Sequence, residues 1–176
     1  MIEEGKMKKI IVAFSVLCCF TVAAWSMDTE VTRETLKGLP GVYVVIEDFH
    51  PNILKHDRLL VKAGATRESL KKLCEDKLTA AGIRVLNREE WLQTLGRPIL
   101  CIAINTHESE RYVYAFDAKV YLMQLATLDA NPKVRTMAET WSINITGQVN
   151  IGNLNHIRDA VSILIDRFIS ARKAVN

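Results

Sequence analysis

The sequence predicts an α/β (α+β) fold in which one mixed sheet packs against helices on one or both faces. In the first half of the chain, stretches rich in β-branched and aromatic residues alternate with helical patterns, which favours parallel strands. In the second half, two long alternating stretches follow one another directly, which favours an antiparallel hairpin. The expected element order is β-α-β-α-β-β-β-α within a single domain, residues 41–176. A signal peptide (residues 1–26) and a flexible lead-in (residues 27–40) are expected before it.

The first half of the chain supplies the expected parallel strands. Residues 41–49 (GVYVVIEDF) have strand composition, and residues 50–65 are expected to form an irregular connection. Thr66 is a suitable N-cap for a helix that Gly82 ends, and residues 83–86 (IRVL) follow as a short second strand. One face of this helix is apolar at helical spacing: Leu70, Leu73, Cys74 and Leu78.

A group of polar residues after this strand resembles an acid–base site but is better explained as the start of a helix. With Asn87 as N-cap, Glu90 falls at the third helical position and completes a capping box. Leu86 and Trp91 then have the spacing of a hydrophobic staple, and Gly96 closes the helix. The sequence therefore predicts a structural cap at this position.

The second half predicts three strands and a C-terminal helix. Residues 98–106 are apolar on both faces, as in a central strand, and residues 112–128 alternate with their even positions buried. A turn at residues 129–132 leads to a further strand at residues 134–149. That strand is expected to carry four apolar residues on one side: Met137, Trp141, Ile143 and Ile145. The final helix has an apolar stripe: Ile157, Val161, Leu164, Ile165 and Phe168.

The N-terminus has the charged, apolar and small-residue order of a secretory signal peptide. Lys8 and Lys9 precede an apolar run over residues 10–24, which is shorter than the roughly 20 residues that a membrane-spanning helix needs. An uncleaved membrane anchor remains the alternative, and translation could begin at Met7 instead of Met1. The expected location is the bacterial periplasm or the exterior, with membrane contact only through an uncleaved signal segment.

Two cysteines, Cys74 and Cys101, remain if Cys18 and Cys19 leave with the signal peptide. An oxidising compartment would permit a disulfide between Cys74 and Cys101, whereas their apolar surroundings favour two buried thiols. The chain has no CxxC motif, which argues against a thioredoxin-like function.

Four residues are candidates for a ligand site in the loops after the first and third strands: His50, His56, Asp57 and His107. Parallel strands would bring these loops to the sheet edge where ligands bind in open α/β sheets, and a zinc-type cluster could form there. No HxH or HExxH spacing holds two ligands together, however, and surface loops collect histidines in any case. We therefore predict no cofactor.

Composition and motifs exclude several functional classes. The formal charge of +3, with no basic run outside the N-terminus, argues against nucleic-acid binding. The chain lacks a GxSxG elbow, an SxxK motif and a glycine-rich phosphate loop. Packing explains a set of aromatic residues at strand spacing, although an exposed part of it could dock a partner along an open strand edge. This set is Tyr112, Tyr114, Phe116 and Tyr121.

The passage AAGIRVLNREEWL, in its strand–helix–strand setting, resembles the group formed by the TolB N-terminal, CsgG and LpoB-like periplasmic α/β domains. Those domains carry an acid–arginine pair before a short helix; here Arg88 keeps the arginine and Asn87 replaces the acid. The resemblance covers most of residues 41–170 in element order, and only the segment around residues 82–92 in sequence. It implies a non-catalytic accessory or scaffold role in the cell envelope.

These observations lead to three functional hypotheses. The first is a secreted, non-enzymatic periplasmic module that binds another cell-envelope protein. The second is a small-molecule or metal-binding periplasmic protein that uses the loops after the first and third strands. The third is a hydrolase without a recognisable motif.

Overall fold

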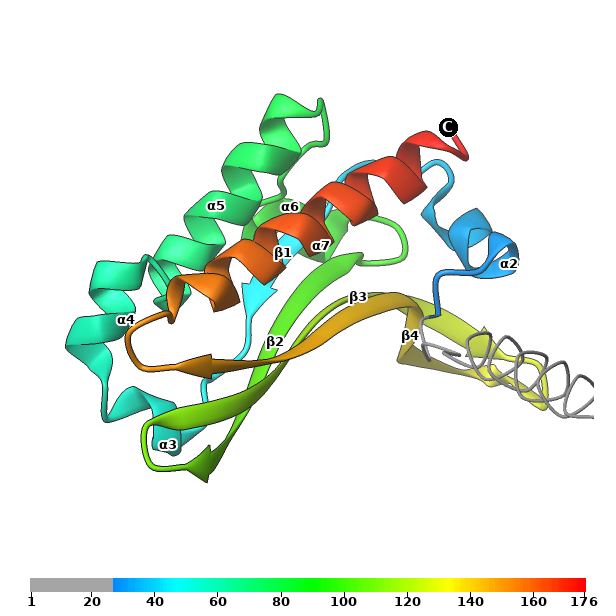
Figure 1. Ribbon diagram of the computed structural model, residues 1–176. Helices are drawn as coiled ribbons and strands as arrows, with labels where there is room; N and C mark the ends of the chain where they lie inside the picture. The colour runs from blue at the N-terminus through cyan, green and yellow to red at the C-terminus, as the bar shows by residue number, and fades with distance from the viewer. Residues whose placement is uncertain (1–26) are drawn as a thin grey trace, which may run out of the picture.

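The computed structural model describes residues 27–176, and its centre is a four-stranded mixed sheet (Figure 1). Strands β1 and β2 are parallel, whereas β2–β3 and β3–β4 are antiparallel, so the predicted mixed sheet with packed helices is confirmed. The expected signal peptide and the alternative membrane anchor lie outside the described residues. In sheet order the strands are β1 (Tyr43–Ile46), β2 (Ile99–Glu110), β3 (Val113–Leu128) and β4 (Asn131–Asn150).

Two long helices, α5 and α7, lie side by side across one face of the sheet (Figure 1). Within residues 27–176, no helix combines the length and apolar character needed to cross a membrane. The helical elements are α2 (Glu30–Arg33), the 3₁₀ turn η1 (Glu34–Leu36), α3 (Pro51–Leu54), α4 (Asp57–Ala63), α5 (Arg67–Ala80), α6 (Arg88–Gln93) and α7 (Asn155–Lys173).

Strand alternation divides the sheet into a helix-covered face and an open face. Leu100 pairs with Leu122, and both are fully buried beneath the helices; the other even positions of β3 from Tyr114 to Val120 are buried as well. This confirms the predicted burial of the even positions from 114 to 122, whereas Tyr112 and Leu128, at the ends of the predicted range, are each 44% exposed. The odd positions, such as Tyr121, point to the other face, which we call the open face. Helix α6 contacts this face at its β1 end. There Trp91 stacks on Tyr43 with ring centroids 5.5 Å apart.

A β-bulge in β4 overturns one predicted face assignment. Leu122 pairs with Trp141 and Met123 pairs with Glu139, which leaves Thr140 as an extra residue. Beyond the bulge, Met137 pairs with an odd position of β3 and lies on the open-face side. The prediction that Met137 shares a side with Trp141 is wrong, because one inserted residue reverses the alternation.

The two predicted helix starts are confirmed. The Thr66 side chain accepts a 3.2 Å hydrogen bond from the backbone of Ser69 at the start of α5. At the start of α6, the Asn87 side chain accepts from the Glu90 amide, and the Glu90 carboxylate accepts from the Asn87 amide, both at 2.9 Å. The opening polar residues of α6 therefore stabilise a helix end.

Residues 50–65 are not the irregular connection that we expected. They form α3 and α4, because Pro51 suits the first position of a helix and His50 caps it. Ile53 and Leu60 are 1% and 3% exposed, so each helix is held by an apolar contact with the core. The expected strand at residues 83–86 is also absent, and only a single parallel bridge joins Val85 to Val42.

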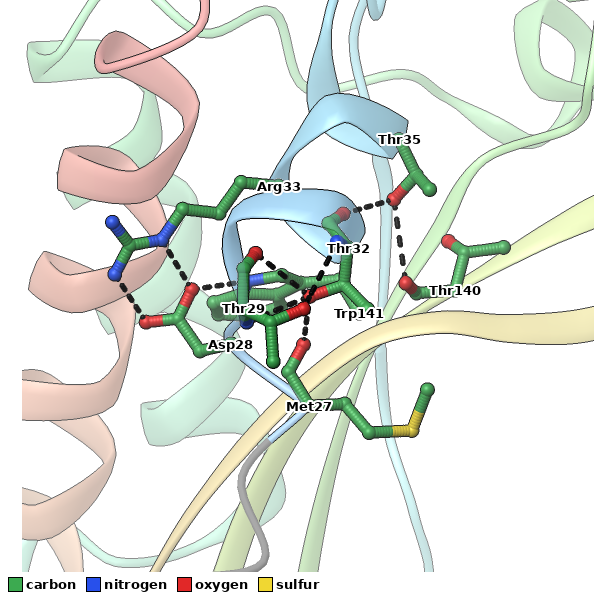
Figure 2. Close-up of polar contacts among 8 residues, drawn as sticks. All are labelled: Met27, Asp28, Thr29, Thr32, Arg33, Thr35, Thr140 and Trp141. Atoms are coloured by element: carbon green, nitrogen blue, oxygen red, sulfur yellow. Dashed lines mark hydrogen bonds and ion pairs between the residues drawn. The ribbon is translucent and has the colours of Figure 1, made fainter.

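Residues 27–40 pack against the sheet and are not a flexible lead-in. Leu36 is completely buried, and Asp28 accepts a hydrogen bond from the indole of Trp141 (Figure 2). Thr35 donates to the backbone oxygen of Thr140 at 3.4 Å. The sequence pattern missed this segment because its partners lie more than a hundred residues away in the chain.

Candidate binding surface

His56 belongs to a network that fastens α3 to the sheet. Its Nε2 atom hydrogen-bonds the hydroxyl of the fully buried Tyr114 at 3.0 Å. That hydroxyl also donates to the backbone oxygen of Asn52 at 3.3 Å. The Asn52 amide donates to the Thr106 carbonyl at 2.8 Å and accepts from the Thr106 hydroxyl at 2.7 Å. Because these groups satisfy one another's hydrogen bonds, the network is structural, and we call it the α3 network.

The other three candidate residues do not converge on His56. His50 accepts from a backbone N–H in the first turn of α3, and Asp57 accepts from the following backbone N–H in α4. His107 lies within β2, which extends beyond the predicted strand end, and its register with Ala115 puts it on the open face. Among residues 27–176, no group of three or more His, Cys, Asp or Glu side chains could hold a metal ion. The structure therefore does not bring these four candidate residues together as a metal site.

Cys74 and Cys101 are both free and buried. Cys74 faces the core from α5, whereas Cys101 pairs with Tyr121 on the opposite face of the sheet, so the sheet separates them. Burial raises the pKa of the Cys74 thiol to about 12 and that of Cys101 to about 11. Of the two alternatives, the structure supports buried thiols, which are protonated and unreactive at neutral pH.

The open face of the sheet is occupied largely by polar pairs within the chain. Lys119 forms a 2.7 Å ion pair with Glu139 and also lies 4.8 Å from the ring centre of Tyr121. The Tyr121 hydroxyl donates to Glu47, and its burial and that carboxylate raise the pKa of Tyr121. Mutual pairing leaves these groups little capacity for an external ligand.

The outer edge of β4 is a more favourable binding surface. β4 is the last strand of the sheet, so one side of its backbone pairs with β3 and the other side pairs with no strand in the described part of the chain. Beside residues 145–148, helix α7 forms the second wall of a groove of about 300 Å³, which we call the β4–α7 groove. Phe116, Ile145 and Ala160 provide its apolar surfaces.

Gly147 gives this groove its shape. A Cβ atom at this position would lie 2.8 Å from Cε1 of Phe116, closer than the two atoms can approach. The absence of a side chain therefore lets β4 cross directly over the aromatic ring. A glycine within a strand is a sequence signal for such a close approach, but Gly147 was not among the residues predicted to form a site.

The α7 wall of the groove carries an imidazole, a carboxylate and an aliphatic side chain at helical spacing. His156, Asp159 and Ile163 follow one another at intervals of three and four residues and all line the groove. Ile163 lies outside the buried stripe of α7, and its side chain is 48% exposed. An apolar residue at such an exposed helix position is a second sequence signal of this surface. The only hydrogen bond to the Asp159 carboxylate from the described residues is a 3.4 Å contact with the Asn155 amide.

Comparisons with known proteins give no family assignment: no protein-family model matches the chain, and no curated protein matches it. The resemblance to the TolB, CsgG and LpoB-like domains therefore remains a prediction that rests on element order and on residues 82–92.

Proposed function

We propose that this protein is a non-catalytic module of the bacterial cell envelope that binds a partner protein by strand addition at the β4–α7 groove. The observation that carries the proposal is the open backbone edge of β4 beside an apolar groove. An unpaired strand edge is a template for another chain, and natural proteins cover or disrupt edges that have no partner. We call residues 131–140 the outer half of β4 and residues 141–150 the inner half. The inner half has an apolar wall beside it, which suits an added strand.

The non-catalytic assignment rests on how the reactive side chains are used. His56 is hydrogen-bonded within the α3 network, His50 caps a helix and Glu90 completes a capping box. Each of these groups already serves the fold, whereas a general acid or base must reach a substrate proton. The predicted signal peptide supports a location in the envelope.

Site-specific photo-crosslinking in intact cells tests this proposal. A photoreactive residue at position 146, on the inner half of β4, should form an adduct with a partner protein. The same residue at position 136, on the outer half of β4, is the matched control because Thr136 is also an exposed strand threonine. We expect a specific adduct from position 146 only.

A second variant ties the adduct to the groove. Ile163→Asp places a charge on the α7 wall and should reduce the adduct at position 146 at least tenfold. Val61→Asp changes another exposed apolar helix residue, on α4, and should leave the adduct unchanged. An adduct that persists in the Ile163→Asp protein, or none from position 146, would refute strand addition at this groove.

A further inference from the structure

We infer that the β4–α7 groove selects an extended peptide segment that carries a basic side chain flanked by aliphatic ones. This inference rests on the proposed function and specifies the chemistry of the partner. The first constraint is conformational, since a chain that pairs with the free edge of β4 must be extended. Its side chains then alternate, and every second one faces α7.

The apolar part of the groove selects aliphatic side chains. Side chains of the added strand that face α7 would meet Ile145 and the exposed Ile163. Gly147 contributes no side chain, so the edge of the Phe116 ring lies directly beneath this part of β4. Covering Ile163 and the groove floor with an aliphatic residue removes apolar surface from water and favours binding.

The acidic part of the groove selects a cation. The Asp159 carboxylate forms no ion pair with any of residues 27–176. The neighbouring Arg158 does not neutralise it, because the Arg158 side chain is directed toward Gly64 at the end of α4. A lysine or arginine on the partner would neutralise the Asp159 carboxylate and form a charge-assisted hydrogen bond with it.

The same carboxylate argues against a second copy of this chain as the occupant. Antiparallel pairing of two β4 edges about a two-fold axis would bring both α7 helices, and both Asp159 carboxylates, to the same side of the joined sheet. The outer half of β4 also resists edge pairing, because it contains Pro132, Lys133, Arg135 and the bulge at Thr140. A heterologous basic segment fits these features better.

Fluorescence anisotropy on the protein purified after export tests the selection. The probe is a labelled heptapeptide, Ser-Val-Thr-Lys-Thr-Val-Ser, whose two valines and lysine share one face when it is extended. The matched peptide has glutamate in place of lysine. We expect the lysine peptide to bind at least tenfold more tightly, and Asp159→Lys to reverse this preference. Asp129→Lys, in the distant β3–β4 turn, is the control and should not change it.

Each other outcome overturns the inference. Equal binding of both peptides, or no effect of Asp159→Lys, would show that the groove does not select a cation. Failure of both peptides to bind, while the crosslink at position 146 persists, would refute this partner chemistry and leave strand addition intact. A dimer that Ile163→Asp dissociates would identify a second copy as the occupant.

Discussion

The indole nitrogen of Trp141 donates a 2.9 Å hydrogen bond to the Asp28 carboxylate and so joins two residues 113 positions apart in the chain (Figure 2). Arg33 donates to both oxygens of the same carboxylate, at 2.6 and 2.8 Å. Trp141 is fully buried, so this contact connects the first described residues to the core of the sheet. The N-terminal segment is thus an integral part of the fold.

Removal of the Asp28 carboxylate should destabilise the protein. Asp28→Ala leaves the indole N–H of Trp141 without its acceptor and Arg33 without its counterion, and we expect a loss of about 2 kcal/mol in the free energy of unfolding. Urea denaturation followed by tryptophan fluorescence measures the change. Glu30→Ala changes an exposed acidic residue two positions later, at the start of α2, and is the control. Equal stability of the Asp28→Ala protein and the wild type would show that this contact contributes nothing.

The Asp28 carboxylate should also make the free energy of unfolding decrease at acid pH. Hydrogen bonds from Arg33 and Trp141 hold the pKa of Asp28 below its ordinary value, against burial, which acts in the opposite direction. The unfolded chain, in which this group titrates near pH 4, therefore binds the proton more tightly than the folded chain does. The contribution of Asp28 should be complete above about pH 4 and disappear as the pH falls through the lower folded pKa.

Chemical denaturation at a series of pH values from 7 to 2 tests this dependence. The difference in unfolding free energy between the wild type and Asp28→Asn should shrink as the pH falls below about 4. A constant difference over the whole series would mean that ionisation of Asp28 does not contribute to stability.

The capping box at the start of α6 should contribute to stability and not to binding. Asn87→Ala removes the acceptor for the Glu90 amide and should lower the unfolding free energy by about 1 kcal/mol. Glu89→Ala changes an exposed neighbour that has no part in the box and serves as the control. The crosslink from position 146 should be unchanged in both proteins. Loss of that crosslink in a folded Asn87→Ala protein would assign a binding role to this residue.

The two described cysteines should resist modification in the folded protein. Burial and their raised pKa values make Cys74 and Cys101 poor nucleophiles at pH 7. A maleimide should therefore label both cysteine-containing peptides only after denaturation, and mass spectrometry measures the extent at each site. If the two peptides remain joined and unlabelled in denaturant without a reductant, the thiols form a disulfide and the free state is wrong.

The features that the sequence predicted well are those whose partners are close in the chain. The N-cap of α5, the capping box of α6 and the apolar stripe of α7 involve residues three or four positions apart, so a helical period and a few side-chain types are sufficient. The prediction for residues 50–65 failed because α3 and α4 are short. Each is stabilised by a single buried residue and by contacts with distant strands, which no local period records.

The candidate site was predicted poorly for a related reason. The candidate loops were expected at one sheet edge, but β2 continues past its predicted end and places His107 on the open face, whereas His56, before α4, bonds Tyr114 on the helix-covered face. The β4–α7 groove joins Gly147 to Asp159 and Ile163 across two elements. Gly147 and Ile163 each depart from the local pattern, but neither indicates which element lies beside it.

The sequence by itself determined the fold class, the helix ends and the buried side of β3, because alternation and capping are local properties of the backbone. Only the tertiary structure decided that residues 27–40 are part of the fold, that a bulge turns Met137 away from Trp141, and that the edge of β4 lies open beside α7. Each of these depends on pairing between distant segments. A shift of one residue in such pairing exchanges the two faces of a strand, and no short stretch of sequence contains that information.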